Sequence, residues 1–215
     1  MLCSLAKMPT ALRWKGQKLF LSPLAGRGSG RGANQDLYEN GAMSVISEQV
    51  VSQSNLIAAA GEHYVLCQLL RLGYVAALAP RGAPNTDIVV TDVTTKRLFN
   101  IQVKTRQEKG SDGGWHMGKK HETLISVQLF YAFVDFGVNV ASPPKTFVVP
   151  SSVVAKTISE MHAAWLGSPG QKGQQRKDTD FRRFVPDYTR YAGPNTHYGP
   201  GWLQPYAEAW GQLSQ

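Results

Sequence analysis

Two neighbouring segments, 86–92 and 97–105, constrain the fold of this chain more than any other feature. Both are rich in β-branched and other apolar residues, and only the short link 93–96 separates them. Two such runs joined by a few polar residues predict an antiparallel β-hairpin. The length of the link lets Asp92 pair with Arg97, and that choice fixes the partner of every other residue in the two strands.

Polar side chains gather on one face of this hairpin. Side chains alternate along a strand, so Gln102 and Lys104 point to the same side. In the register set by the link, Asp87 lies directly opposite Gln102, with Lys104 two residues further along. The rest of the ladder is apolar (Ile88, Val89, Val90, Ile101 and Val103). A merely wetted face is the alternative, but it would not need an acid, an amide and an amine at this spacing.

A helix is expected over 54–72, with Gly73 where a helix C-terminal glycine belongs. Glu62 lies within its apolar stripe, whose members are Ala58, Ala59, Val65, Leu66 and Leu69. A carboxylate in such a stripe is costly unless it meets a cation, a metal or hydrogen-bond donors. The alternative is a glutamate at the edge of the stripe that reaches solvent.

The remaining apolar patterns complete the element order. Further strands are expected at 74–79, 130–136 and 146–149, and a second helix at 151–166. The order is helix, three strands, a polar insert, two strands and a helix. It predicts an α/β fold with a mixed central sheet flanked by helices. Neither GxGxxG nor GxxxxGK[ST] occurs, so no motif supports a nucleotide-binding fold of those kinds.

Composition narrows the partners and the compartment. The formal net charge of +8 favours polyanions such as DNA. Two cysteines support neither a disulfide framework nor a zinc site, which indicates a cytoplasmic protein. No apolar run is long enough to cross a bilayer, so no membrane association is expected.

The two ends of the chain differ from its centre. Residues 1–42 are basic and Gly-rich, which favours a disordered extension or upstream sequence read through before Met43 over a transit peptide. Residues 43–166 form the expected core. Residues 167–215 are basic and then rich in Tyr and Trp, and we expect them to pack on that core.

The insert that follows the second hairpin strand carries cations and one large aromatic residue. Arg106, Lys119 and Lys120 are candidates for contacts with DNA phosphates, and Trp115 for stacking on a base. The alternative is a solvated loop with Trp115 folded back on the core.

Three of these elements together resemble the PD-(D/E)XK nuclease superfamily. They are Gly61-Glu62 in the first helix, Asp87 at a strand start just after Pro84, and Gln102-Val103-Lys104 at the end of the next strand. The resemblance implies the αβββαβ core of restriction endonucleases. It also implies Mg²⁺ or Mn²⁺ as cofactor and DNA as substrate.

Carried onto this chain, the resemblance gives each residue a role. Asp87 would be the central metal ligand, and Gln102 would occupy the position of a glutamate, as in Mrr-like members. Lys104 would orient the attacking water, and Glu62 would steady the metal and its water shell.

The predicted activity is hydrolysis of DNA phosphodiester bonds by a metal-dependent endonuclease. A DNA-binding module that kept the fold and lost turnover stays open as an alternative, as does an unrelated α/β enzyme acting on a small phosphorylated metabolite. Whether the chain forms a homodimer also stays open.

Overall fold

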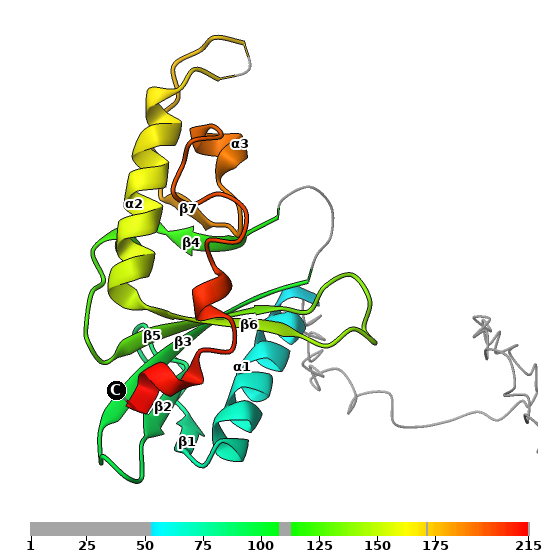
Figure 1. Cartoon of the computed structure of the whole chain (residues 1–215), viewed down its shortest axis with the longest axis vertical. Helices are drawn as coiled ribbons and strands as arrows, with labels where there is room; N and C mark the ends of the chain where they lie inside the picture. The colour runs from blue at the N-terminus through cyan, green and yellow to red at the C-terminus, as the bar shows by residue number, and fades with distance from the viewer. Residues whose placement is uncertain (1–52, 108–112, 171, 215) are drawn as a thin grey trace, which may run out of the picture. The chain divides into compact units, whose positions relative to one another are not determined.

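The computed structural model describes residues 53–107, 113–170 and 172–214. The extension predicted for residues 1–42 lies outside this part of the chain. The main feature of the described residues is a sheet in the order β1 (Val75–Leu78), β2 (Ile88–Thr91), β3 (Leu98–Arg106), β5 (Leu129–Asp135) and β6 (Lys145–Pro150) (Figure 1). The central pair β3–β5 is parallel and every other pair is antiparallel. The chain therefore has the predicted mixed sheet flanked by helices.

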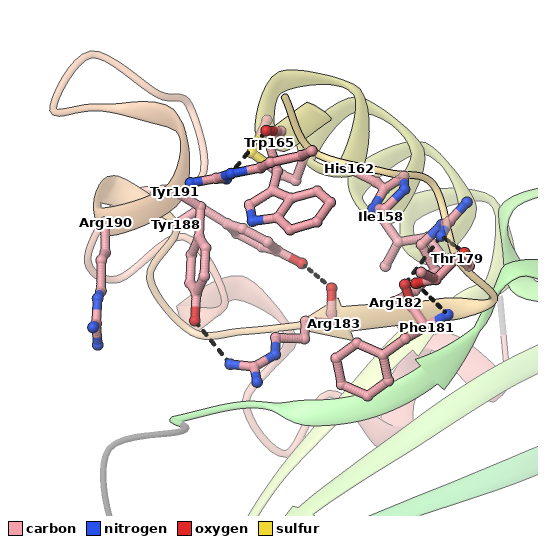
Figure 2. A pocket seen from close by; sticks show the side chains of 12 residues that line it. Ile158, His162, Trp165, Thr179, Phe181, Arg182, Arg183, Tyr188, Arg190 and Tyr191 are labelled. Carbon is pink, nitrogen blue, oxygen red and sulfur yellow. Dashed lines mark hydrogen bonds between the residues drawn. The ribbon is translucent and has the colours of Figure 1, made fainter. Parts of the chain in front are cut away.

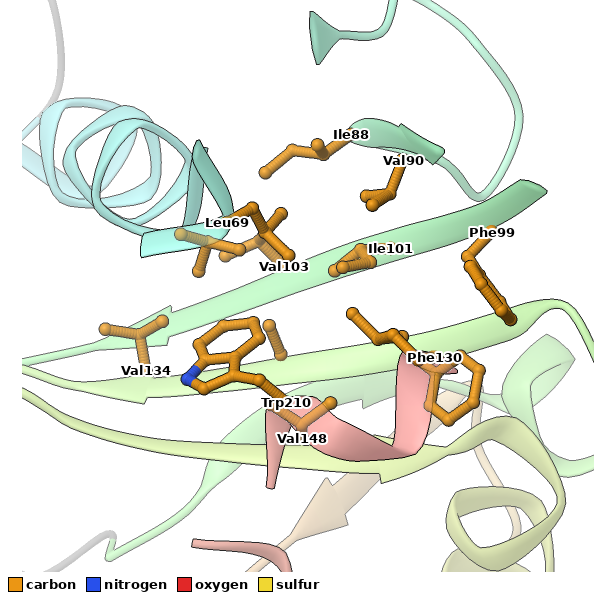
Figure 3. Packing of buried hydrophobic residues seen from close by; sticks show 13 residues of the cluster. Leu69, Ile88, Val90, Phe99, Ile101, Val103, Phe130, Val134, Val148 and Trp210 are labelled. Carbon is orange, nitrogen blue, oxygen red and sulfur yellow. The ribbon is translucent and has the colours of Figure 1, made fainter. Parts of the chain in front are cut away.

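Helix α1 (Gln53–Arg71) covers one face of the sheet. Its Val65 and Leu69 are fully buried and belong to the same apolar cluster as Ile101 and Val103 of β3 (Figure 3). The helix ends at Arg71. Gly73 occupies the C-terminal glycine position predicted for it, with a φ of 88°. Its N–H donates to Leu70 O and the next N–H donates to Leu69 O, both at 3.1 Å, which is the paired closure of a Schellman motif.

Gly61 sets how closely α1 approaches β3. A Cβ atom at this position would overlap the Thr105 hydroxyl and would lie 2.8 Å from the Thr105 Cβ. Only glycine fits such an approach. The closeness places Glu62, the next residue of the helix, beside the C-terminal end of β3.

Helix α2 (Ser151–Gly167) lies on the other side of the sheet (Figure 1). Its Val154 and Ile158 share an apolar cluster with Tyr131 and Phe133 of β5. A second sheet continues this layer, in which β4 (Trp115–Gly118) pairs antiparallel with β7 (Phe181–Phe184). Neither strand was predicted: the sequence reading placed both segments in polar stretches.

Short helical turns complete the described chain. They are η1 (Lys119–Glu122), α3 (Thr189–Ala192), η2 (Gln204–Tyr206) and η3 (Trp210–Ser214). Trp210 and Leu213 of η3 belong to the apolar cluster under α1, so the end of the described chain contributes to the core. None of the helices in the described residues combines the length and apolar character that a membrane crossing requires.

Candidate functional site

The predicted register of the hairpin is confirmed. Ile88 pairs with Ile101, and the N–H of Asp92 donates to Arg97 O at 3.0 Å. At the other end of the ladder the Asp87 N–H donates to Ile101 O at 2.9 Å. Asp87 therefore sits at the mouth of the hairpin, next to Gln102 on the neighbouring strand.

The carboxylate of Asp87 is held against β3. Its Oδ2 accepts the Val103 N–H at 2.7 Å, so the side chain replaces a backbone acceptor where the ladder between β2 and β3 ends. A backbone donor fixes the orientation of the carboxylate. Oδ1 is the oxygen that this bond leaves available.

Gln102 provides the least expected feature of the site. It is 8% exposed, and its Oε1 is buried with no hydrogen-bond partner among the described residues. A buried acceptor without a partner costs about 1–3 kcal/mol. Such an atom fits a position that accepts from an ordered donor or coordinates a cation.

Lys104 lies on the same face of β3 as Gln102, because the two are separated by one residue of the strand. Burial lowers the pKa of its ammonium group, and the nearby charge of Lys120 lowers the pKa further. The Asp87 carboxylate acts in the opposite direction and raises it. The lysine thus interacts with the acid that the sequence reading placed beside it.

Glu62 approaches from α1, which packs on the opposite face of the sheet. Burial raises the pKa of its carboxyl group, and the charge of Asp87 raises it further, while His63 lowers it. The two carboxylates are therefore close enough to repel each other. A cation between them would remove this repulsion.

These residues offer oxygen donors to a metal. Within residues 53–107, 113–170 and 172–214, no group of three or more His, Cys, Asp or Glu side chains is arranged to hold an ion. The set is instead two carboxylates, Glu62 and Asp87, and the unpaired amide oxygen of Gln102. It fits Mg²⁺ or Mn²⁺, which accept few protein oxygens and keep several waters. It does not fit zinc.

The turn η1 brings two further residues to the site. The Lys120 ammonium donates to Asn85 Oδ1 at 2.7 Å, which ties η1 to the loop before Asp87. His121 is 2% exposed and shares a 2.7 Å hydrogen bond between its Nδ1 and the Tyr131 hydroxyl. Burial, followed by the charges of Lys104 and Lys120, lowers the pKa of His121 to about 4.

Sequence reasoning gave His121 no role in the site. Its partner Tyr131 is the neighbour of Gln102 in the parallel pair β3–β5. An apolar strand pattern does not reveal which strand lies beside which, or in which register, so no signal in the sequence brings this histidine to the site.

The stacking role predicted for Trp115 is wrong, and the alternative, folding back on the core, is correct. The side chain is 1% exposed and its Nε1 donates to Val134 O at 3.0 Å. Its ring packs against Phe133, and the Arg106 guanidinium lies 4.4 Å from the ring centroid. A ring that is buried to this extent cannot stack on a base.

The basic residues predicted to contact DNA differ in the partners that they have within the chain. Arg106 is mostly buried, and its Nη2 is paired with Asp135 at 2.6 Å, so its first role is structural. Lys119 is exposed and pairs with Asp178 at 2.8 Å. Lys120 is exposed beside Lys104 and remains the candidate nearest to the acids.

A cleft of about 420 Å³ opens beside the end of β3. Lys104 forms part of its wall, together with the start of α1 and the start of β4. Its other lining residues are Gln53, Ser54, Ile57, Thr105, Arg106, Gln107, Gly113, Gly114, Trp115 and His116. The lysine is therefore accessible to a molecule lying along this cleft, even though its own side chain is half-buried.

The chain matches no protein-family model and none of the curated proteins compared with it. One solved structure similar to it is that of a bacterial homing endonuclease, I-Ssp6803I, at 16% sequence identity and a TM-score of 0.42. The similarity covers 76% of this chain and 94% of that one.

Proposed function

We propose that this chain is a metal-dependent nuclease of the PD-(D/E)XK kind that hydrolyses DNA phosphodiester bonds. One observation carries the proposal: the Oε1 of Gln102 is buried without a partner among the described residues, Gln102 lies opposite Asp87 across the hairpin, and Lys104 follows two residues later on the same face. A structural hairpin gains nothing from this grouping. A site for a cation and a phosphate needs each member.

Asp87, Gln102 and Glu62 would hold Mg²⁺ or Mn²⁺. When bound, such an ion neutralises charge on the phosphate and makes a bound water more acidic. Asp87 is preset for this role by its bond to the Val103 N–H. Glu62 must lose its proton to contribute, and its raised pKa makes that loss occur at a higher pH than for an exposed glutamate.

The lysines would act on the phosphate group. Lys104 lines the cleft at the end of β3 and lies near Asp87, so its half-buried ammonium would stabilise charge that develops on the phosphate oxygens. Lys120 is exposed beside it and can position the adjacent phosphate. Arg106 would act indirectly, by bracing Trp115 in the wall of the cleft while it pairs with Asp135.

The test is divalent-dependent cutting by the purified full chain, on supercoiled, linear, single-stranded and branched DNA. Asp87→Asn and Lys104→Ala are each expected to reduce cutting at least 100-fold, because each removes charge from the reacting centre. Asp187→Asn, at an exposed acid distant in sequence, is the matched control and should cut like the wild type. Cutting that survives both site substitutions would contradict the proposal.

A second candidate is a DNA-binding module of the same fold without turnover. The uncharged amide of Gln102 favours it, since it leaves two carboxylates for the metal. Tight DNA binding with no cutting under Mg²⁺ or Mn²⁺ would support the module and contradict the enzyme.

A further inference from the structure

The turn η1 lies between the candidate nuclease site and a group of charged side chains on β7 and the segment before it. Its two middle residues contact the site: Lys120 donates to Asn85 Oδ1, and His121 shares a hydrogen bond with the Tyr131 hydroxyl. Lys120 also lies close enough to Lys104 for its charge to lower the pKa of that lysine. The position of η1 therefore sets where the exposed ammonium group of Lys120 lies.

The two ends of η1 are fixed by one buried arginine and its partners. Arg182 of β7 is 2% exposed, and its guanidinium pairs with Glu122, the last residue of η1. The guanidinium also pairs with Asp178 at 3.0 Å. Asp178 pairs in turn with Lys119, the first residue of η1, at 2.8 Å. Both ends of the turn are thus joined to the same guanidinium, one directly and one through a carboxylate.

Every nitrogen of the Arg182 guanidinium has a partner within the chain. Nε donates to Glu122, and Nη2 donates to Asp178. Nη1 donates to the backbone carbonyls of Thr179 and Phe181, beside which Figure 2 shows the arginine. A planar guanidinium held by four acceptors has one orientation, which the single ammonium of a lysine could not reproduce. This arginine is therefore not free to bind a ligand.

The backbone supports the same position of η1. Strand β4 leads directly into the turn, and its Met117 pairs with Arg182 of β7. The Lys119 N–H then donates to Asp180 O at 2.8 Å, which extends the pairing to the first residue of η1. Buried ion pairs add little net stability, because the cost of desolvation offsets their attraction. A role in fixing the position of η1 accounts for this one.

We propose that Arg182, through its pair with Glu122, is a positioning residue that holds η1 so that the Lys120 ammonium contacts a DNA phosphate beside the candidate nuclease site. That the phosphate belongs to DNA rests on the proposed nuclease function. Arg182 itself touches neither the DNA nor a metal. The observation that carries the inference is that one guanidinium holds both ends of the four-residue turn whose middle presents Lys120.

The test measures binding of the full chain to a short fluorescein-labelled DNA duplex by fluorescence anisotropy, in EDTA, so that cutting plays no part. Lys120→Gln is expected to weaken binding about fivefold and to lower the slope of log K against log salt by about 0.9, the value for one phosphate contact on duplex DNA. Glu122→Gln should weaken binding about threefold and lower the slope in the same direction, because it releases the end of η1. With Mg²⁺ present, the loss should appear in KM and leave kcat unchanged.

The direction of the Glu122→Gln effect separates positioning from a change of charge. Removing a negative charge by itself favours binding to a polyanion. Weaker binding therefore requires that the cation Lys120 has moved. Glu160→Gln makes the same charge change at an exposed residue of α2 whose partners are Lys156 and Tyr198, and it should bind DNA at least as tightly as the wild type.

A double variant shows whether the pair acts through Lys120. If it does, Glu122→Gln combined with Lys120→Gln binds DNA like Lys120→Gln alone. Melting temperatures show whether Glu122→Gln still folds. If it does not, Glu122→Asp decides alone, since it keeps the charge beside Arg182 but shortens the side chain, and it should weaken binding about twofold.

Each outcome bears on the proposal. Weaker binding by Glu122→Gln, with no further loss in the double variant than in Lys120→Gln, supports it. Binding by Glu122→Gln as tight as that of the wild type, or tighter, overturns it. Losses that multiply in the double variant also overturn it, because the pair would then act on another contact. A wild type that binds no duplex at all would contradict the proposed function itself, and the positioning role with it.

Discussion

Gln102 shows at the scale of one residue how the candidate site departs from a fully charged metal centre. Its amide oxygen is buried with no hydrogen-bond partner in the described part of the chain, yet it brings no negative charge. An amide can ligate a hard cation, but each lost carboxylate lowers the affinity for that cation. Substitutions at this position therefore test whether the proposed site binds its metal and hydrolyses DNA.

Gln102→Glu is expected to tighten Mg²⁺ or Mn²⁺ binding about tenfold or more, because a third carboxylate then faces the ion. Titration calorimetry with each metal measures this change. Asp87→Asn should reduce the affinity in the same experiment, and the control Asp187→Asn should not change it. Equal metal affinity in wild type, Gln102→Glu and Asp87→Asn would show that the ion does not bind at these residues.

His121 carries a second prediction at the residue scale, on stability. Its pKa in the folded chain, about 4, lies below the ordinary value of 6.5. The unfolded chain therefore binds a proton as the pH falls below about 6.5 while the folded chain resists it. The contribution of the neutral His121 side chain to the free energy of unfolding is fully present above about pH 6.5 and is lost as the pH falls toward 4.

Urea unfolding at pH 7 and pH 5 measures the effect. The free energy of unfolding of the wild type should fall by about 1–2 kcal/mol more than that of His121→Gln over this interval. Glutamine keeps a polar partner for the Tyr131 hydroxyl but does not titrate. If the free energy of unfolding depended on pH in the same way in both proteins, the lowered pKa of His121 would be contradicted.

At the scale of elements, the contact between α1 and β3 positions the acids. Gly61 allows the backbone of the helix to meet Thr105, and the next residue, Glu62, then lies within electrostatic reach of Asp87. The two carboxylates come from opposite sides of a sheet edge. Their distance therefore depends on how closely helix and strand pack.

Gly61→Ala is expected to lower the free energy of unfolding by about 1–3 kcal/mol, since the added methyl group overlaps Thr105 and the helix must move. For a domain of this size, that is a fall of about 2–12 °C in melting temperature. DNA cutting should fall with it. Gly167→Ala, at the last residue of α2 with open space around it, should leave both unchanged or slightly improved. Equal melting of Gly61→Ala and wild type would contradict the close packing.

The elements that the sequence predicted are those whose signal is local. The hairpin 86–105 follows from its apolar runs and short link, and its register placed Asp87 beside Gln102. The paired strands β4 and β7 have only four residues each, and Trp115 pairs with Phe184, far away in the chain. No local pattern specifies such a pairing, so the burial of Trp115 could not be read from the insert.

At the scale of the whole described chain, two layers flank one sheet, and each contributes to the candidate site. The α1 layer supplies Glu62 to the acids at the sheet edge. The α2 layer, with β4 and β7, supplies the buried Arg182 that pairs with Glu122 of η1. The first arrangement was predictable in outline because it lies within consecutive elements, whereas the second depends on a contact between Glu122 and Arg182 that only the folded chain brings together.

The parallel pairing of β3 and β5 has a consequence for the connection between them. Because both strands run in the same direction, the chain must travel back along the sheet before β5 begins. The described part of this connection runs through β4 and η1, which bring Lys120 to the loop before β2 and His121 to Tyr131 of β5. A much shorter link could not span this return, and the connection that the parallel pairing requires is here the same segment that brings the cation Lys120 next to Asn85 and Lys104.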